Sequence, residues 1–226
     1  MSGFPLSEAD RDRVTAAVTA AEAGTDGEIV TIITQRSDEY RDTAWIWGIA
    51  AVLLLGAIVA LWPWIIDAKL ALFIDPWGKE PSSGLRFLML LALQAVVLVL
   101  VQLGLGYRRL RIALTPPPTK WRRVARRANL CFKVAADQRT AQRVGILLYL
   151  SLDERRAEIV ADQAIHGAVP AERWGEAMAA LLDAVRDGRP ADGLVDAIGR
   201  IGAIIGEHFP KTVGDLNELP DRLIEL

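Results

Sequence analysis

Acidic and amide side chains at two places in the chain have the residue types and spacing to bind a divalent cation. Asp162 follows a run that is typical of a strand, and Asp215, Asn217, Glu218 and Asp221 form the pattern DxNExxD near the C-terminus. Calcium and magnesium prefer hard oxygen ligands of this kind. If the five residues converge, they form a metal site that could support phosphatase chemistry. Alternatively, Asp215 or Asn217 caps a short final helix whose first turn contains Glu218 and Asp221.

The other residues capable of chemistry occur in patterns that favour structural roles. His166 and His208 are the only histidines, and neither belongs to a metal-binding pattern such as HExxH. Ser151 has no candidate base near it in the sequence, which favours a polar turn serine over a nucleophile. Cys131 is the single cysteine and lies on an apolar helical stripe, where a buried thiol is expected. The sequence contains no GxSxG, P-loop or GxGxxG motif, so it shows no catalytic constellation.

Two long segments of the chain lack charged residues, and their location decides which other parts of the chain can come together in a site. Residues 44–66 and 87–107 contain no Lys, Arg, Asp or Glu. As helices they would be about 34 and 32 Å long, enough to cross a hydrocarbon layer of about 30 Å. The expected organisation is an N-terminal part of a soluble domain at 1–43, a transmembrane hairpin at 44–107 with spans at 44–66 and 85–107, and a basic juxtamembrane segment followed by the rest of the soluble domain at 108–226.

Positive charge is concentrated directly after the second apolar segment. Residues 108–139 carry a net charge of +9, whereas residues 1–43 and 140–226 carry −5 and −6. Basic residues beside a span mark its cytoplasmic side, so we expect both termini in the cytoplasm and residues 67–86 outside a bacterial-type plasma membrane. The basic segment could lie against anionic lipid. Nucleic acid is not an expected partner, because the segment is juxtamembrane and both neighbouring soluble parts are acidic.

The soluble residues alternate between helix and strand patterns. The strand nearest the N-terminus cannot bury its apolar residues alone, so it should join the two later strands in a mixed sheet with helices on its faces. The expected fold class is therefore a mixed-sheet α/β sandwich interrupted by a two-helix transmembrane hairpin. The sequence predicts helices at 8–24, 121–135, 174–188 and 194–209, and strands at 28–34, 144–150 and 156–161.

Three stretches resemble the TPM domain family. They are TDGEIV at 25–30, VGILLYLSLDERRAEIVADQAI at 144–165 and GEHFPKTVGDLNELPDRLIEL at 206–226. More narrowly, the chain is similar to bacterial membrane proteins whose TPM domain is interrupted by two spans. The resemblance implies an α/β sandwich attached to a membrane, divalent-metal binding in some members, and roles from weak acid phosphatase activity to assembly or repair of membrane complexes. The acidic active-site signature of secreted members has no clear counterpart here, since DQAIH and NELPD segments are found instead.

Two classes of function follow from these observations. The first is a membrane-anchored cytoplasmic interaction module that supports assembly, maintenance or oligomerisation of membrane complexes, with the lipid bilayer and other membrane proteins or its own copies as partners. The second is a weak phosphatase dependent on calcium or magnesium. The first is favoured because the sequence contains no recognisable catalytic constellation.

Overall fold

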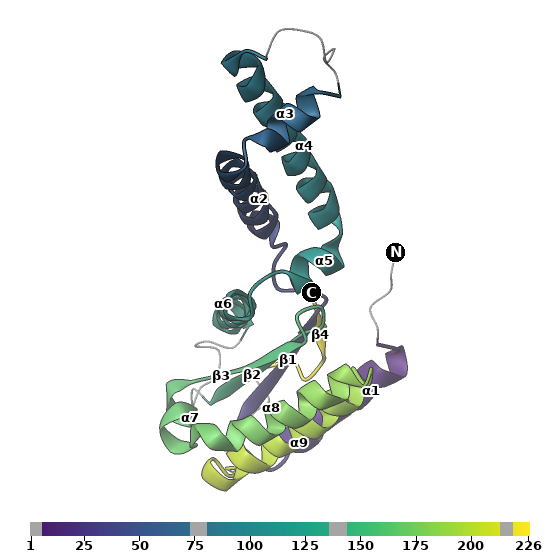
Figure 1. Cartoon of the computed structure of the whole chain (residues 1–226). Helices are drawn as coiled ribbons and strands as arrows, with labels where there is room; N and C mark the ends of the chain where they lie inside the picture. Colours follow the sequence, from purple (N-terminus) through teal and green to yellow (C-terminus); the bar gives the residue numbers. More distant parts are fainter. Residues whose placement is uncertain (1–5, 73–80, 136–143, 213–218) are drawn as a thin grey trace. The chain divides into compact units, whose positions relative to one another are not determined.

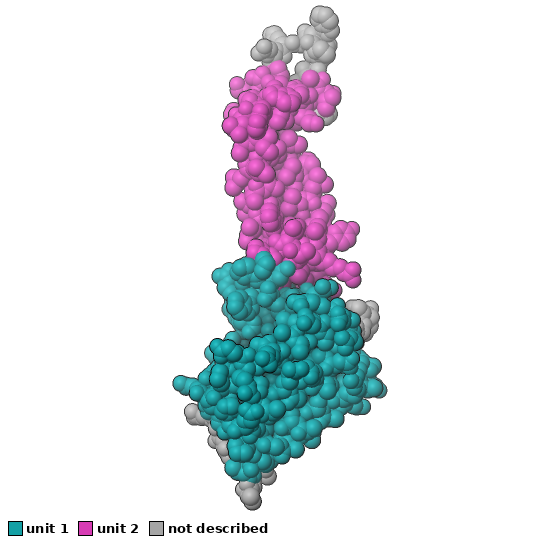
Figure 2. All heavy atoms as spheres, turned by 60° about the horizontal axis from the view of Figure 1, so that its bottom comes forward, with its two compact units in different colours: residues 1–38, 117–226 teal, residues 39–116 magenta. Residues whose placement is uncertain are grey.

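The structure, a computed structural model, describes residues 6–72, 81–135, 144–212 and 219–226. The chain divides into two compact units, which are coloured separately in Figure 2. The α/β unit comprises residues 1–38 and 117–226, with α1 (Glu8–Glu22), β1 (Glu28–Thr34), α6 (Pro117–Ala135), β2 (Gly145–Ser151), β3 (Arg156–Ala161), α7 (Gln163–Ala168), α8 (Ala171–Arg186), α9 (Pro190–His208) and β4 (Ile224–Glu225). The helical unit comprises residues 39–116, with α2 (Arg41–Leu61), α3 (Trp64–Leu70), α4 (Ser83–Gly106) and α5 (Arg108–Ala113).

The sheet of the α/β unit is mixed and has the strand order β3-β2-β1-β4. β1 pairs in parallel with β2 along its whole length, from Glu28 opposite Gly145 to Thr34 opposite Ser151. β3 returns antiparallel to β2, and β4 adds a short parallel pair on the other side of β1. The predicted mixed sheet is therefore confirmed, including the position of the first strand beside the later hairpin. β4 is an addition that the sequence did not predict.

Alternate side chains of β1 and β2 enter two separate hydrophobic cores, because successive residues of a strand point to opposite faces. Figure 1 shows α1, α8 and α9 on one face of the sheet and α6 on the other. Both faces are thus covered, which explains why β1 and β2 are apolar along nearly their whole length. The face toward α1, α8 and α9 carries Ile29, Ile33, Ile146, Leu148 and Leu150, and the face toward α6 carries Val30, Ile32, Leu147 and Tyr149.

α1 and α9 approach each other most closely at Gly202. A Cβ atom at this position would lie 2.6 Å from the Cβ of Ala21 and 3.0 Å from its Cα. Carbon atoms that are not bonded pack at about 3.5 to 4.0 Å, so no larger residue fits without moving α1. The glycine is therefore required by the packing of two helices rather than by its own backbone conformation.

In the helical unit, α2 and α4 pack against each other through small and amide residues. Gln94 Nε2 donates to the carbonyl oxygen of Val52, and Gln102 Nε2 donates to that of Ala44, each at 3.3 Å. Both glutamine side chains of α4 thus face α2. A Cβ at Gly48 would lie 2.8 Å from a methyl carbon of Leu98, so this glycine also marks a close approach.

The first apolar helix is shorter than the segment predicted at 44–66. α2 ends at Leu61, and a separate helix begins at Trp64 after Pro63. The physical reason is that proline has no backbone N–H and its ring clashes with the carbonyl of the preceding turn, so it ends a helix or begins a new one. The second segment is a single helix, Ser83–Gly106.

Two further predictions differ from the structure near prolines and at the C-terminus. The helix predicted at 121–135 begins earlier, because Pro117 and Pro118 form the first turn of α6, where their missing N–H groups need no partner. The expected final helix does not include Asp221, which lies just before the strand Ile224–Glu225. The predicted helix at 8–24 is present as α1, and the Ser7 side chain caps it by accepting from the backbone N–H of Asp10 in a capping box.

Candidate functional site

α2 and α4 expose apolar surface along most of their lengths. They contain 21 and 24 residues, and only 17% and 6% of their most apolar stretches are buried in the structure. The core helix of a water-soluble domain would instead bury one face. Both helices are therefore long and apolar enough to cross a membrane. The exposed side chains include Trp45, Ile46, Ile49, Leu53 and Leu54 on α2 and Phe87, Leu88, Leu91, Val99 and Leu103 on α4.

The structure describes two of the five residues predicted to bind a cation. Asp162 precedes α7, and its Oδ2 accepts from the backbone N–H of Gly145 at 2.8 Å. Asp221 accepts from the hydroxyl of Thr19 on α1 at 2.5 Å. Asp215, Asn217 and Glu218 lie outside the described residues. Within the described part of the chain, no group of three or more His, Cys, Asp or Glu side chains is placed to hold a metal ion, so the metal site stays a prediction.

A buried carboxyl group that the sequence did not reveal lies close to Asp221. Glu22, the last residue of α1, is buried, and its Oε1 accepts from the backbone N–H of Ile29 at 2.7 Å. Its Oε2 is buried without a hydrogen-bond partner among the described residues. Burial raises the pKa of Glu22 to about 8; the hydrogen bond from Ile29 opposes this, and the negative charges of Glu28 and Asp221 add to it. At neutral pH the side chain is therefore largely protonated.

The stability of the α/β unit is expected to fall as the pH rises, because of Glu22. The pKa is raised from 4.5 in the reference state to about 8 in the fold, so between these values the folded chain binds more protons than the unfolded chain. Each unit of pKa difference corresponds to about 1.4 kcal/mol at most, so the loss between pH 5 and pH 9 amounts to a few kcal/mol. Chemical denaturation of the full chain in detergent at several pH values measures it.

The matched variants for this pH dependence are Glu22→Gln and Glu176→Gln. Glutamine at position 22 keeps an oxygen for the Ile29 N–H and cannot ionise, so its stability should vary less with pH than that of the original chain. Glu176 is exposed on α8, and its replacement should leave the pH dependence unchanged. If the original chain and Glu22→Gln lost stability in parallel from pH 5 to pH 9, the assignment to Glu22 would be wrong.

Ser151 belongs to a buried hydrogen-bond network and is inaccessible to a substrate. Its side chain is fully buried and donates to Glu154 at 2.5 Å. Ser37 joins the network through its hydroxyl, 3.0 Å from Tyr149 and 3.1 Å from Ser151, and its N–H donates to Glu154 at 3.0 Å. The statement that no candidate base lies near Ser151 in the sequence is therefore wrong, because Glu154 is only three residues away. The expectation of a structural serine agrees with this burial, although Ser151 is the last residue of β2 rather than part of the turn.

The same network holds the chain where the helical unit is inserted into the α/β unit. The turn between β2 and β3 binds the residues after β1, since Gln35 Nε2 donates to Asp153 at 2.7 Å and the Asp153 N–H donates to the Gln35 carbonyl at 2.9 Å. On the other side of the insertion, Arg123 of α6 pairs with Asp38 at 3.0 Å. The segments directly before and after the inserted helical unit are therefore both bonded to other parts of the α/β unit.

α6 buries only part of the stripe predicted for it. Val124, Ala128 and Phe132 are buried against the sheet, and Cys131 is half-buried, where burial raises the pKa of its thiol. The thiol is thus a packing group with little thiolate character, as expected. Trp121, in the first turns of the same helix, is 60% exposed.

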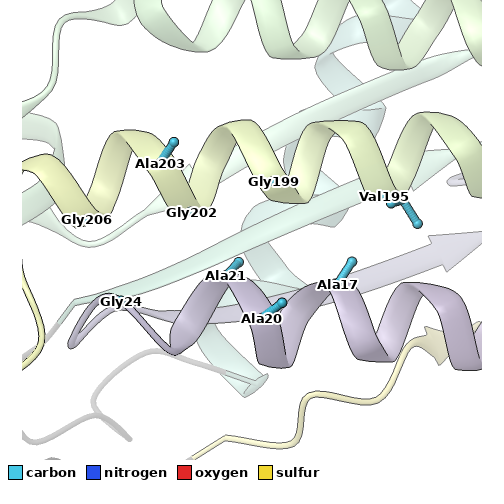
Figure 3. A pocket seen from close by; sticks show the side chains of 9 residues that line it. All are labelled: Ala17, Ala20, Ala21, Gly24, Val195, Gly199, Gly202, Ala203 and Gly206. Carbon is cyan, nitrogen blue, oxygen red and sulfur yellow. The ribbon is translucent and has the colours of Figure 1, made fainter.

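A shallow groove with a volume of about 530 Å³ runs between α1 and α9 (Figure 3). The described residues that line it are apolar and include no acid, base or nucleophile. Its lining consists of alanine, glycine and valine: Ala17, Ala20, Ala21, Gly24, Val195, Gly199, Gly202, Ala203 and Gly206.

The comparisons with known proteins agree with this arrangement of helices and strands. Residues 110–204 match the TPM domain family. The TPM match includes β2, β3 and α6, but not β1 or the C-terminal segment, where part of the sequence resemblance lies. No curated protein matches the chain.

Among solved structures, the chain is similar to the NMR structure of the BA42 protein from the psychrophilic bacterium Bizionia argentinensis. The two share 17% sequence identity with a TM-score of 0.58, and the match covers 100% of this chain and 99% of BA42. At this identity the likeness supports the fold alone. Together with the TPM match it indicates a mixed α/β fold of TPM type.

Proposed function

We propose that the chain is a membrane-anchored TPM module, in which α2 and α4 cross a plasma membrane of bacterial type as a hairpin. The observation that carries the proposal is the exposed apolar surface of these two helices. In water such surface would drive aggregation, whereas a bilayer covers it at no cost in unpaired backbone groups, because a helix satisfies its own hydrogen bonds. The amide contacts of Gln94 and Gln102 are also internal to the hairpin.

Both termini and the α/β unit are assigned to the cytoplasm. The basic residues follow α4 directly, beginning with Arg108 and Arg109, and basic residues beside a span are retained on the cytoplasmic side. Two spans return the chain to its starting side. Residues 67–86 then lie outside, and the first and last of them, Asp67 in α3 and Arg86 in α4, form an ion pair at 2.7 Å.

The anchored α/β unit acts as an interaction module that holds other membrane proteins or copies of itself. The groove between α1 and α9 supports this role, because it is an open apolar surface lined by small side chains. A metal-dependent phosphatase is the alternative proposal, and three of its five candidate ligands, Asp215, Asn217 and Glu218, lie outside the described residues.

Single cysteines test both parts of the proposal in the full chain, with Cys131→Ala as background. Ser83→Cys, at the start of α4, should react with a membrane-impermeant maleimide in intact cells. Ala203→Cys, exposed in the groove, should react only after lysis. A cell-permeant bis-maleimide should then link Ala203→Cys to another protein or a second copy, while Glu176→Cys, exposed on α8, serves as the control for random collision.

The topology, the membrane anchor and the contact surface in the groove would each be contradicted by a different result. Labelling of Ala203→Cys but not Ser83→Cys in intact cells would reverse the topology. Recovery of the chain in the soluble fraction would remove the anchor. Equal cross-linking yields from Ala203→Cys and Glu176→Cys would remove the groove as a contact surface.

A further inference from the structure

One surface of the α/β unit is basic, and its charges form no ion pair with the residues that the structure describes. This surface, which we call the outer face of α6, is the side of the helix turned away from the sheet. α6 carries six basic residues and no acidic residue. The outer face consists of Arg122, Arg126, Arg127, Leu130, Lys133 and Val134, all of which are exposed.

On the helices at the opposite face of the sheet, arginines form ion pairs with acidic side chains. Arg173 pairs with Glu207 at 3.0 Å, and Arg200 pairs with Asp196 at 2.8 Å. Arg186 and Arg13 are likewise paired with aspartates. On the outer face of α6, none of Arg122, Arg126, Arg127 and Lys133 forms an ion pair with a described residue. A mixed, self-compensating surface is typical of contact with water, whereas uncompensated positive charge attracts an anionic partner.

Exposed aliphatic residues lie among these charges. Leu130 is 51% exposed and Val134 is 71% exposed, although both belong to a helix that already buries its apolar stripe against the sheet. A helix with basic residues surrounding a few apolar side chains is suited to the boundary between headgroups and acyl chains. Long arginine and lysine side chains there can keep their charges at the phosphate level while their stems cover apolar surface.

The chain length between α4 and α6 favours lipid over other anionic partners. Only ten residues, 107–116, separate the end of α4 from the start of α6, and six of them form α5. If α4 crosses a bilayer, α6 cannot move far from its surface. Anionic headgroups are then present at high local concentration, which nucleic acid in solution is not.

We propose that the outer face of α6 binds the anionic headgroups of membrane lipids, so that the α/β unit is held to the bilayer by charge as well as by its covalent anchor. The proposal rests on the proposed membrane anchor for the proximity of lipid. A basic residue close to an anionic surface contributes about 1 kcal/mol, which is about fivefold in affinity. Removing three charges should therefore weaken the preference for anionic lipid by about 100-fold.

A fluorescent probe on the full chain tests this binding. In a Cys131→Ala background, Asn129→Cys places an environment-sensitive dye beside the outer face without removing a charge. The chain is incorporated into nanodiscs of phosphatidylcholine alone or of phosphatidylcholine mixed with phosphatidylglycerol, and quenching by a neutral, water-soluble reagent such as acrylamide is measured. We expect the dye to be protected several-fold more in the anionic discs, with the difference reduced by high salt because exposed charges are screened.

Two triple variants test whether lipid binding depends on the outer face of α6 or only on the net positive charge of the chain. Arg122→Gln, Arg126→Gln and Lys133→Gln together should abolish the protection by anionic lipid. Arg173→Gln, Arg186→Gln and Arg200→Gln remove the same number of exposed arginine or lysine charges from α8 and α9 and should leave the protection unchanged. Circular dichroism and the melting temperature report whether either triple variant still folds.

The possible outcomes distinguish this inference from the proposed anchor. Incorporation into the discs with equal quenching in both lipid mixtures would overturn the lipid site and leave the anchor. Failure to enter discs, combined with protection of the dye by anionic vesicles, would overturn the anchor and leave the lipid site. Stronger protection by double-stranded DNA than by anionic discs, lost in the α6 triple variant, would assign the face to nucleic acid and overturn the proposal.

Discussion

Gly202→Leu is expected to destabilise the α/β unit by about 3 kcal/mol, at the upper end of the usual cost of overpacking. The reason is that even a Cβ at this position would lie 2.6 Å from Ala21 Cβ and 3.0 Å from its Cα, so the obstacle includes the backbone of α1. A leucine could be accommodated only if α1 moved away from α9 and uncovered apolar residues of the core. Chemical denaturation of the full chain in detergent measures the loss.

Gly199→Leu is the matched control for this prediction. It lies on the same helix three residues earlier, and nothing lies within 4 Å of the position that its Cβ would occupy. Leucine has a better helix propensity than glycine by about 0.8 kcal/mol, so this variant should be as stable as the original chain or slightly more stable. Equal destabilisation by the two substitutions would show that helix composition, rather than contact with Ala21, limits residue size on α9.

Residues 117–226 alone are expected not to fold, whereas residues 1–38 joined to them should form a cooperative α/β domain. β1 is buried along all seven residues and lies between β2 and β4, so without it β2 loses its parallel partner and both cores lose one wall. A short glycine and serine linker should suffice, because Asp38 and Arg123 form an ion pair at 3.0 Å. Circular dichroism and urea denaturation compare the two proteins.

A single substitution tests whether residues 1–38 act by supplying the buried apolar strand β1. Ile33→Asp in the joined protein places an unpaired carboxylate at a fully buried position, which should prevent folding as completely as the loss of β1. Cooperative unfolding of residues 117–226 alone, at the urea midpoint of the joined protein, would mean that β1 is only an accessory to the sheet.

The local sequence was sufficient for most individual elements. β1 and β3 have the predicted bounds, and α1 begins directly after its capping residue Ser7. These elements are readable because propensity, capping and hydrophobic period agree over several consecutive residues. At Trp62 and Pro63 these signals conflict. The apolar composition predicted one continuous helix there, whereas the chain forms two helices, α2 and α3.

The joining of distant segments was predictable only in outline. A lone apolar strand before a long insertion must pair with something, which is enough to predict that β1 enters the later sheet. Closing a loop of 78 residues, 39–116, costs little more free energy than closing a shorter one, because the entropic cost grows only with the logarithm of length. The sequence could not predict that β1 lies between β2 and β4, because strand order depends on packing across the whole unit.

The sequence by itself determined the charge pattern, the two apolar helices and the alternation of helices and strands, since each depends on neighbouring residues. Only the tertiary structure decided which polar groups are buried together. Glu22 meets the charges of Glu28 and Asp221, and Ser37 meets Ser151 and Glu154, through folding of segments that are up to about 200 residues apart in the sequence. Burial and charge act through space rather than along the chain, so neither the raised pKa of Glu22 nor the lack of ion pairs to described residues on the outer face of α6 follows from residue spacing.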